Sequence, residues 1–296
     1  MCGTQRCKAT PSAIIGVQDA AEVVVSTSHT CLRTTGGAVS CWGVNANGTL
    51  GNGGFGAAVY TPAAVSGLSS GVTKLATAGY SHTTCAVKAG EVYCWGRTFG
   101  EGNLGHDPAA DAACTSSTCA PSPVKISGLT GVFDLAVGER ASCVVVQGGA
   151  VKCWGSNLFG QLGVGAAEPS GYTVRAVSGV SQVVALSGSM ATLCARTQTG
   201  TLWCWGLAES GGVGDGSITG AACSQGACRA TPAQVTLPTG SVQHAIGSTS
   251  FSLDASGALS GWGANGFGEL AHAPGSAGDA TCGAGNCAAS PQLIAL

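Results

Sequence analysis

The cysteines are the residues whose number and spacing most strongly suggest chemistry in this sequence. There are 16 among 296 residues. They form eight close pairs: Cys2–Cys7, Cys31–Cys41, Cys85–Cys94, Cys114–Cys119, Cys143–Cys153, Cys194–Cys204, Cys223–Cys228 and Cys282–Cys287. An even count in regular pairs favours disulfides over buried free thiols, and disulfides persist in oxidising compartments. We therefore expect eight disulfides in a secreted protein that is extracellular or attached to the cell surface.

Metal or cofactor chemistry is the alternative use of such cysteines. Four of the pairs have the spacing C-x-x-x-x-C, and four thiolates can hold a structural zinc ion. That spacing differs from the common C-x-x-C, and each site would have to form between segments that the fold keeps apart. No C-x-x-C-H segment for covalent haem is present. We expect loop disulfides, no metal and no cofactor.

Histidines and carboxylates are the other candidates for a site. His29 and His82 occupy equivalent repeat positions, and we expect their ring nitrogens to bond a neighbouring repeat's backbone. His106 and His272 lie in Gly-rich segments that also contain three carboxylates, namely Asp107, Asp111 and Asp279. A metal or sugar site could use them, although solvated loop residues are the favoured interpretation. The 14 carboxylates show no acid/base pair, so we do not expect an enzyme.

Two apparent catalytic motifs lack the structural setting that they require. The segment GLSSG (67–71) matches G-x-S-x-G but lies between strand-like segments, whereas a nucleophile elbow joins a strand to a helix. The segment GNGGFG (51–56) matches G-x-G-x-x-G without a helix N-terminus to bind pyrophosphate. Neither motif is interpreted as functional.

The elements that position these residues recur along the chain. The dipeptide Trp-Gly occurs at intervals of 53, 59, 51 and 57 residues, beginning at Trp42, Trp95, Trp154, Trp205 and Trp262. Periods of this length indicate a propeller or another repeat array. Each longer interval contains a C-x-x-x-x-C segment. We predict that the repeated Trp side chains fill the space between neighbouring blades.

Each repeat contains four strand-like segments separated by turns. The second repeat shows them as VTKLATAG (72–79), TCAVK (84–88), EVYCWG (91–96) and the Pro-led SPVKI (122–126). Four short strands per unit describe a propeller blade. We predict an all-β propeller of four-stranded antiparallel blades in a single array. Its five complete repeats span approximately 15–65, 66–126, 127–177, 178–235 and 236–294.

The hairpin between the second and third strands tests the disulfide prediction. Counting outward from the turn at Ala89 and Gly90 places Cys85 opposite Cys94, close enough for a disulfide. In the fifth repeat both cysteines are replaced, by Phe251 and Gly261. Joint loss of the two partners indicates a bond between them.

The Pro-led strand occurs six times, once more than the other three. Residues 1–14, which include TPSAI (10–14), form either the end of a preceding repeat or a spare strand. A closed ring of five blades, part of a longer array, and pairing of the spare strand with a second copy all remain open.

The segments SHTTCAVKAGEVYCWG (81–96) and WGSNLFGQLG (154–163) resemble the regulator of chromosome condensation repeat, especially its cysteine-bearing bacterial version. This resemblance covers nearly the whole chain and implies a β-propeller, most often of seven blades. The pattern departs from the family at WGLAESGGVG (205–214) and WGANGFGELA (262–271). The chromatin and GTPase-exchange roles of the family's namesake are not carried over, because the cysteines suit a secreted protein.

Charge and hydropathy exclude two classes of partner. The formal net charge is −2 with 12 scattered Lys and Arg residues, which offers no footprint for nucleic acid. No apolar run approaches the roughly 20 residues that span a bilayer, so we expect no membrane insertion. The N-terminal segment MCGTQRC does not resemble a signal peptide. The segment NGT (47–49) makes Asn47 a possible glycosylation site.

Three functions fit this scaffold. The leading hypothesis is a cell-surface or extracellular propeller that binds a protein partner through its blade loops. The second is a structural protein, a subunit that assembles head-to-tail with itself into a homo-oligomer, fibre or surface layer. The third is lectin-like carbohydrate binding by four loop aromatics: Phe55, Phe99, Phe159 and Phe267.

Overall fold

The computed structural model describes residues 12–80, 82–115, 117–165, 169–223, 226–276, 278–282 and 285–294. Cys2, Cys7 and most of the predicted spare strand lie outside these residues, and residues 12–14 form no strand. The described residues contain 23 strands in five antiparallel sheets, which we call blades one to five in chain order. The chain is therefore an all-β propeller array.

Each blade lies within one predicted repeat. Blade one contains β1 (Ala20–Val25), β2 (His29–Thr34), β3 (Val39–Asn45) and β4 (Gly56–Ala64). Blade two contains β5 (Val72–Thr77), β6 (Thr83–Lys88), β7 (Glu91–Arg97), β8 (Ala112–Ala113) and β9 (Thr118–Lys125). Blade three contains β10 (Val132–Val137), β11 (Ala141–Val146), β12 (Ala150–Gly155) and β13 (Gly171–Ala176).

The last two blades have five strands each. Blade four contains β14 (Val183–Ser189), β15 (Thr192–Thr197), β16 (Leu202–Leu207), β17 (Ala221–Cys223) and β18 (Gly226–Val235). Blade five contains β19 (Ser241–Ala245), β20 (Thr249–Asp254), β21 (Leu259–Ala264), β22 (Ala280–Cys282) and β23 (Gly285–Leu293). Two 3-10 turns lie in blade connections, η1 (Pro108–Ala110) and η2 (Glu209–Gly211).

The short strands β8, β17 and β22 are the main difference from the predicted four-stranded blade. Each pairs with the outer strand that follows it, and each occurs in a repeat with a C-x-x-x-x-C segment. Those segments form tight hairpins, in which Cys223 faces Gly226 and Cys282 faces Gly285. A two-strand hairpin satisfies backbone groups that a loop would leave to solvent, so the outer edge of these blades gains a strand.

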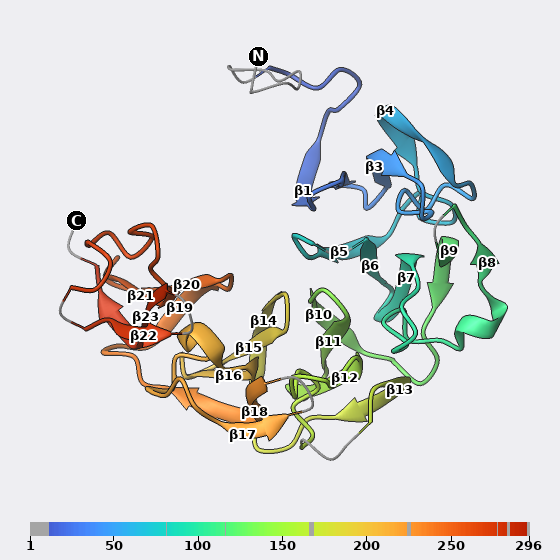
Figure 1. Cartoon of the computed structure of the whole chain (residues 1–296). Helices are drawn as coiled ribbons and strands as arrows, with labels where there is room; N and C mark the ends of the chain where they lie inside the picture. The colour runs from blue at the N-terminus through green and yellow to red at the C-terminus, as the bar shows by residue number, and fades with distance from the viewer. Residues whose placement is uncertain are drawn as a thin grey trace.

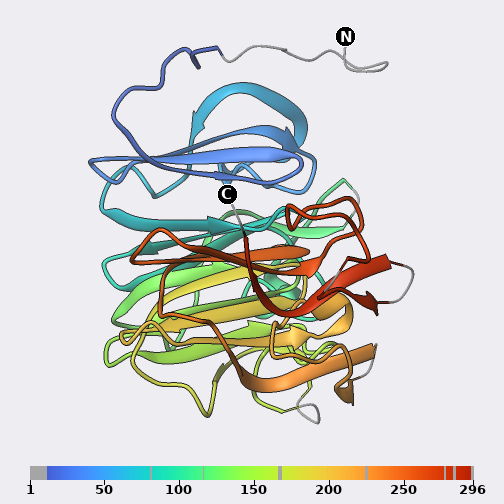
Figure 2. The same cartoon turned by 90° about the vertical axis from the view of Figure 1, so that its left-hand side faces the viewer.

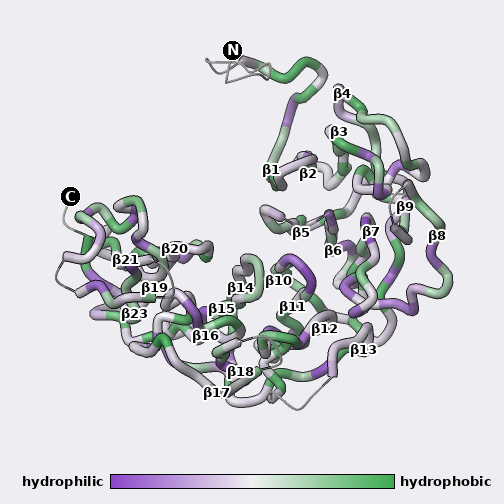
Figure 3. The backbone as a smooth tube through the Cα atoms, in the orientation of Figure 1, coloured by the Kyte–Doolittle hydropathy of each residue, from purple (hydrophilic) through white to green (hydrophobic). Residues whose placement is uncertain are grey.

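The blades follow one another around an arc, and blades one and five stand apart at its two ends (Figure 1). The first strands β1, β5, β10 and β14 lie toward the centre of the arc in the same view. Figure 2 shows the sheets edge-on, with blade one at the top. Hydrophilic and hydrophobic segments alternate along the arc (Figure 3). No helix in the described part of the chain is long and apolar enough to cross a membrane.

The hydrophobic core lies between blades. The cluster between blades one and two combines Leu50 with Leu75 and Trp95, and the cluster between blades two and three combines Leu104 with Leu135 and Trp154. Similar clusters surround Trp205 and Trp262. Because each blade buries its apolar residues against a neighbour, the faces at the two ends of the arc are unlike those inside it.

The repeated Trp side chains are part of these interfaces. Four of them are 0% exposed and donate their Nε1–H to a backbone oxygen of the preceding blade. The donor and acceptor residues are Trp95 to Thr49, Trp154 to Asn103, Trp205 to Gln161 and Trp262 to Gly212. Trp42 lies in blade one, the first blade among the described residues, and it is only partly buried.

Each of the four buried Trp rings packs on a glycine, at a position where a Cβ would collide with the ring. A Cβ on Gly51 would lie 2.7 Å from Trp95 Nε1, and one on Gly214 would lie 2.6 Å from Trp262 Nε1. The φ angles at these two glycines are +64° and +74°. The residue at the same position of blade five is Ala271, with a φ of +61°. The glycine of the connection therefore leaves room for the Trp ring of the next blade, and blade five has alanine in its place.

Seven of the eight predicted cysteine pairs are disulfides in the structure. The four hairpin pairs face each other in register, and their Cα atoms are 4.1 Å apart. In blade five Phe251 faces Gly261 in the same register. A Cβ on Gly261 would lie 3.0 Å from the Phe251 ring, so the glycine makes room for the aromatic side chain that replaces the disulfide.

Candidate binding site

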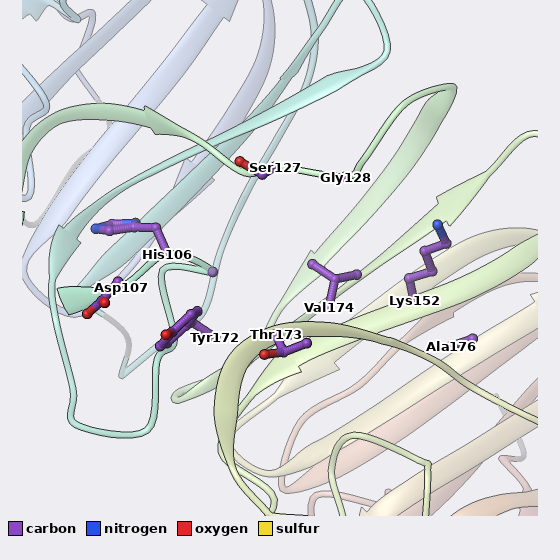
Figure 4. Close-up of a pocket in the computed structure, with 10 residues that line it drawn as sticks. His106, Asp107, Ser127, Gly128, Lys152, Tyr172, Thr173, Val174 and Ala176 are labelled. Carbon is purple, nitrogen blue, oxygen red and sulfur yellow. The ribbon is translucent and has the colours of Figure 1, made fainter.

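A cavity of about 620 Å³ lies on the outer side of the arc between blades two and three. Its walls come from the connection at Gly105–Asp107, the turn at Ser127 and Gly128, and strand β13. His106 and Lys152 lie toward opposite ends of it, with Tyr172 and Thr173 between them (Figure 4). Tyr172 is 44% exposed, so the cavity offers an aromatic surface beside a cation and an imidazole. Such mixed surfaces suit contact with another protein.

His106 is held in place by an acidic partner. Its Nε2 lies 2.7 Å from Asp111 Oδ1, and the Thr98 hydroxyl also donates to that carboxylate. The hydrogen bond to Asp111 raises the pKa of His106 above its usual value, against the opposing effect of burial. In blade five, His272 Nε2 lies 3.8 Å from Asp279 Oδ1 and 3.0 Å from Gln292 Oε1.

The sequence left open a metal or sugar site at these histidines. His106 and Asp111 do come together, while Asp107 instead caps η1 by accepting from Ala109 N. Among the residues that the structure describes, no group of three or more His, Cys, Asp and Glu side chains could hold a metal ion. The His–Asp pairs therefore order the blade connections of blades two and five.

His29 and His82 lie at the interface of blades one and two. His29 Nε2 is 2.7 Å from Thr84 Oγ1, and its Nδ1 is 2.8 Å from Ser26 Oγ. His82 Nδ1 is 3.3 Å from Ser28 Oγ. The expected partner was backbone, whereas these contacts are to hydroxyls. Burial, reinforced by nearby His82, lowers the pKa of His29 to about 4, so it is neutral at pH 7.

The four loop aromatics do not share one environment. Phe267 is 96% exposed and Phe55 is 46% exposed, whereas Phe159 is partly buried. Phe99 lies between two guanidinium groups, 4.7 Å from Arg97 and 5.0 Å from Arg140 to its ring centroid. A repeated sugar platform needs equivalent exposed rings, and these side chains do not provide it.

Asn47 is buried in the native fold. Its side chain is 6% exposed, and its Oδ1 accepts a hydrogen bond of 3.3 Å from Ser117 in blade two. Thr49, which completes the sequon, is 0% exposed. Glycosylation at Asn47 stays a prediction, and a glycan on the folded chain would have to displace this contact.

A charged network on the first strands is the feature that sequence reasoning missed. Glu22, Lys74 and Asp134 occupy the same position in blades one, two and three, where each first strand has a bulge. Lys74 Nζ lies 3.6 Å from Glu22 and 3.4 Å from Asp134. Glu22 also accepts from Leu75 N at 2.9 Å, and Asp134 accepts from Leu186 N at 2.7 Å. The signal for it in the sequence was the alternation of negative and positive charge at this one position of successive repeats.

The carboxylates of this network thus bind the backbone of a following blade. Glu22 joins blade one to blade two, and Asp134 joins blade three to blade four. Each carboxylate is shared with a cation, which offsets the cost of its partial burial. The network holds neighbouring blades in register along the inner side of the arc.

Comparison with known proteins bears on the repeat itself. The profile of the regulator of chromosome condensation (RCC1) repeat matches residues 36–86, and a second profile of the same repeat matches residues 134–161. The chain is 30% identical over 252 residues to the ultraviolet-B receptor UVR8 of Arabidopsis thaliana. It is 31% identical over 250 residues to the E3 ubiquitin-protein ligase HERC2 of Homo sapiens. The chain belongs to the RCC1-repeat family.

The match covers 83% of this chain and 53% of UVR8, and 81% of this chain and 5% of HERC2. The RCC1-repeat chain thus spans about half the length of the first of these relatives, and much less of the second. The yeast RCC1 protein Prp20, in a crystal structure with Kap60, superposes with a TM-score of 0.72 at 18% identity, covering 94% of this chain and 61% of Prp20. Human WBSCR16 superposes with a TM-score of 0.63 at 23% identity, covering 77% and 56%. These structures share the propeller fold.

Proposed function

We propose that this RCC1-repeat chain is an extracellular or cell-surface scaffold, stapled by disulfides, that binds a protein partner through its blade connections. The observation that carries the proposal is the cavity between blades two and three, which Tyr172, Lys152 and His106 line together. The other polar clusters described above serve the blades themselves. Related propellers support a protein partner: yeast RCC1 is found bound to Kap60, and Prp20p has binding properties toward Gsp1p and histones.

The disulfides support the oxidising location. The four hairpin disulfides are built from cysteines that are 0% exposed, one in each of blades one to four. Buried cystines in a repeat array stabilise it mainly by restricting the unfolded chain. Mass spectrometry of unreduced native material tests this: about 2 Da should be missing for each cysteine pair relative to the reduced chain. Native material with reduced thiols would overturn the proposed location.

Affinity capture tests the binding surface. The double variant Tyr172→Ala, Lys152→Glu should lose a partner that the wild-type chain captures and that is then verified with purified components. Tyr60→Ala is a matched control, because Tyr60 is 89% exposed on β4 and outside the cavity. Equal binding by all three proteins would overturn the cavity as the binding surface.

Head-to-tail assembly into a fibre or surface layer is the second candidate. It is favoured by the face of blade one that points away from blade two. On this face Trp42 is only partly buried, and Val23 and Val25 are 55% and 61% exposed. The equivalents of Val23 inside the arc, such as Leu75 and Leu135, are 1% and 2% exposed. Light scattering of unreduced protein separates the candidates, since assembly requires polymers and a binding module requires a discrete species.

A further inference from the structure

Blade four lacks the inner carboxylate but keeps the cation that would pair with it. In blade one, Glu22 faces Arg33 across β1 and β2, and Arg33 Nε lies 3.1 Å from Glu22 Oε2. The same register in blade four places Ala185 opposite Arg196. Among the residues that the structure describes, Arg196 makes no ion pair, and its buried Nε has no hydrogen-bond partner.

His244 of blade five presents a second buried nitrogen without a partner. Its Nε2 is buried and unbonded within the described part of the chain, while the ring also bonds the backbone carbonyl of Cys194. Burial, followed by the nearby Arg196, lowers the pKa of His244 to about 4. His244 is therefore neutral at pH 7. With the other ring nitrogen donating to Cys194, Nε2 is a hydrogen-bond acceptor.

Both side chains line one cavity of about 360 Å³ on the inner side of the arc. Its apolar walls include Phe133, Val184 and Val242, which are 46%, 37% and 47% exposed. Lys74 and Asp134 also line it, but they bind each other at 3.4 Å. The cavity therefore combines one unpaired guanidinium, one unpaired acceptor and an apolar surface.

We propose that this cavity binds the carboxyl end of an acylated amino acid with an apolar side chain, as found at the C-terminus of a polypeptide. The carboxylate would bind Arg196, whose planar group suits a carboxylate's two oxygens. The adjacent amide N–H would donate to His244 Nε2 once the imidazole turns to bring that buried nitrogen to the cavity surface, and the apolar side chain would lie against Phe133 and Val242. A singly charged carboxylate matches one unpaired cation better than a dianionic phosphate does, because Asp134 is nearby.

This site is separate from the outer cavity, so it stands or falls independently of the proposed protein binding there. The probe is N-acetyl-leucine, which carries the carboxylate, the amide N–H and the apolar side chain. Its matched partner is N-acetyl-leucinamide, which lacks the negative charge. Ligand-observed NMR by saturation transfer reports weak binding by either compound to the full, oxidised chain.

The decisive variant is Ala185→Glu, which supplies Arg196 with an internal carboxylate as Glu22 does for Arg33. It should fold as the wild type does and bind N-acetyl-leucine at least about tenfold more weakly, as should Arg196→Gln. Lys125→Gln removes a positive charge from β9, outside both cavities, and should leave binding unchanged. Isocaproate, which lacks the amide N–H, should bind more weakly than N-acetyl-leucine to the wild-type chain.

Equal binding of the acid and the amide, or full binding by a folded Ala185→Glu protein, would overturn the proposal. Equal binding of isocaproate would overturn the role of His244. A longer peptide ending in leucine separates the two sources of the ligand. Tighter binding than N-acetyl-leucine assigns the site to polypeptide C-termini, and equal binding assigns it to small acylated amino acids.

Discussion

Single residues at the blade interfaces determine more of the packing between blades than their residue types alone suggest. The sequence predicted that the repeated Trp side chains fill the space between blades, and the Trp-Gly spacing was sufficient for this. It did not reveal that Gly51 and its equivalents leave the space in which the Trp ring of the next blade lies. That requirement joins residues about 45 positions apart, such as Thr49 and Trp95, which no local pattern connects.

Alanine at such a glycine should lower the free energy of unfolding only where another blade follows. Gly51→Ala places a Cβ 2.7 Å from Trp95 Nε1 at a φ of +64°, so we expect a loss of about 3 kcal/mol in unfolding free energy from strain and overpacking. Ala271→Gly, at the same position of blade five, should leave stability unchanged or raise it by up to about 1 kcal/mol. Urea unfolding of both variants checks this, and equal effects would contradict the role of the Trp contact.

The buried histidines make stability depend on pH. His29 has a pKa of about 4 in the folded chain and an ordinary value of 6.5 when unfolded. The unfolded state therefore binds more protons between these values, and stability is lost as pH falls through them. Each such histidine lowers the free energy of unfolding by up to about 1.4 kcal/mol for each pH unit of acidification between the two pKa values.

His29→Gln isolates this effect from His106, whose raised pKa acts in the opposite sense. From pH 7 to pH 5 the wild type should lose about 2 kcal/mol more than the variant, with His82 and Arg97 unchanged in both. Urea unfolding at the two pH values measures the difference. Identical losses in the two proteins would show that His29 does not titrate as its burial requires.

At the scale of the element, the register of the hairpins could be predicted from the sequence, whereas the strands at the outer edge of the blades could not. Counting outward from a two-residue turn fixed which cysteines face each other, because an antiparallel pair alternates strictly. The strands β8, β17 and β22 are two or three residues long, and no periodicity can be seen in so short a segment. Their C-x-x-x-x-C spacing was read as a loop disulfide, although it also closes a hairpin.

Blade five should accept the disulfide that it lacks. Phe251→Cys with Gly261→Cys restores the register of the other hairpins, whose bonded Cα atoms are 4.1 Å apart. Replacing Phe251 also removes the ring that a Cβ at position 261 would meet at 3.0 Å, and leaves the Leu270 side chain, 2.8 Å from that Cβ, to move into the space of the lost ring. Unreduced mass spectrometry should therefore show one further bond, about 2 Da lighter than the reduced double variant.

The single variant Gly261→Cys is the control for this prediction, because it retains Phe251 and its close contact. It should be less stable than the wild type and should keep one titratable thiol. Free thiols in the double variant under oxidising conditions would contradict the register of blade five.

At the scale of the molecule, the sequence predicts five repeats in this chain but neither the native number of blades nor the closure of the ring. Five Trp-Gly repeats predicted five blades, and five sheets are present. Closure depends on the curvature added by each interface, which arises from side-chain packing between residues of different repeats. The first and last blades stand apart because five such steps do not complete the circle (Figure 1).

The two ends of the arc are not complementary to each other. Blade one presents Trp42, whose equivalents each pack on a glycine, but blade five presents Ala271 in place of that glycine. A second copy that stacked Trp42 on blade five would meet a Cβ where the ring must lie.

We therefore expect the wild-type chain to remain unpolymerised, and Ala271→Gly to increase self-association through that face. Light scattering across a hundredfold range of concentration compares the two proteins, with Trp42→Ala in the glycine background as the control that removes any gain. Wild-type polymers that Trp42→Ala abolishes would instead establish head-to-tail assembly, and would show that Ala271 is accommodated by movement of the ring.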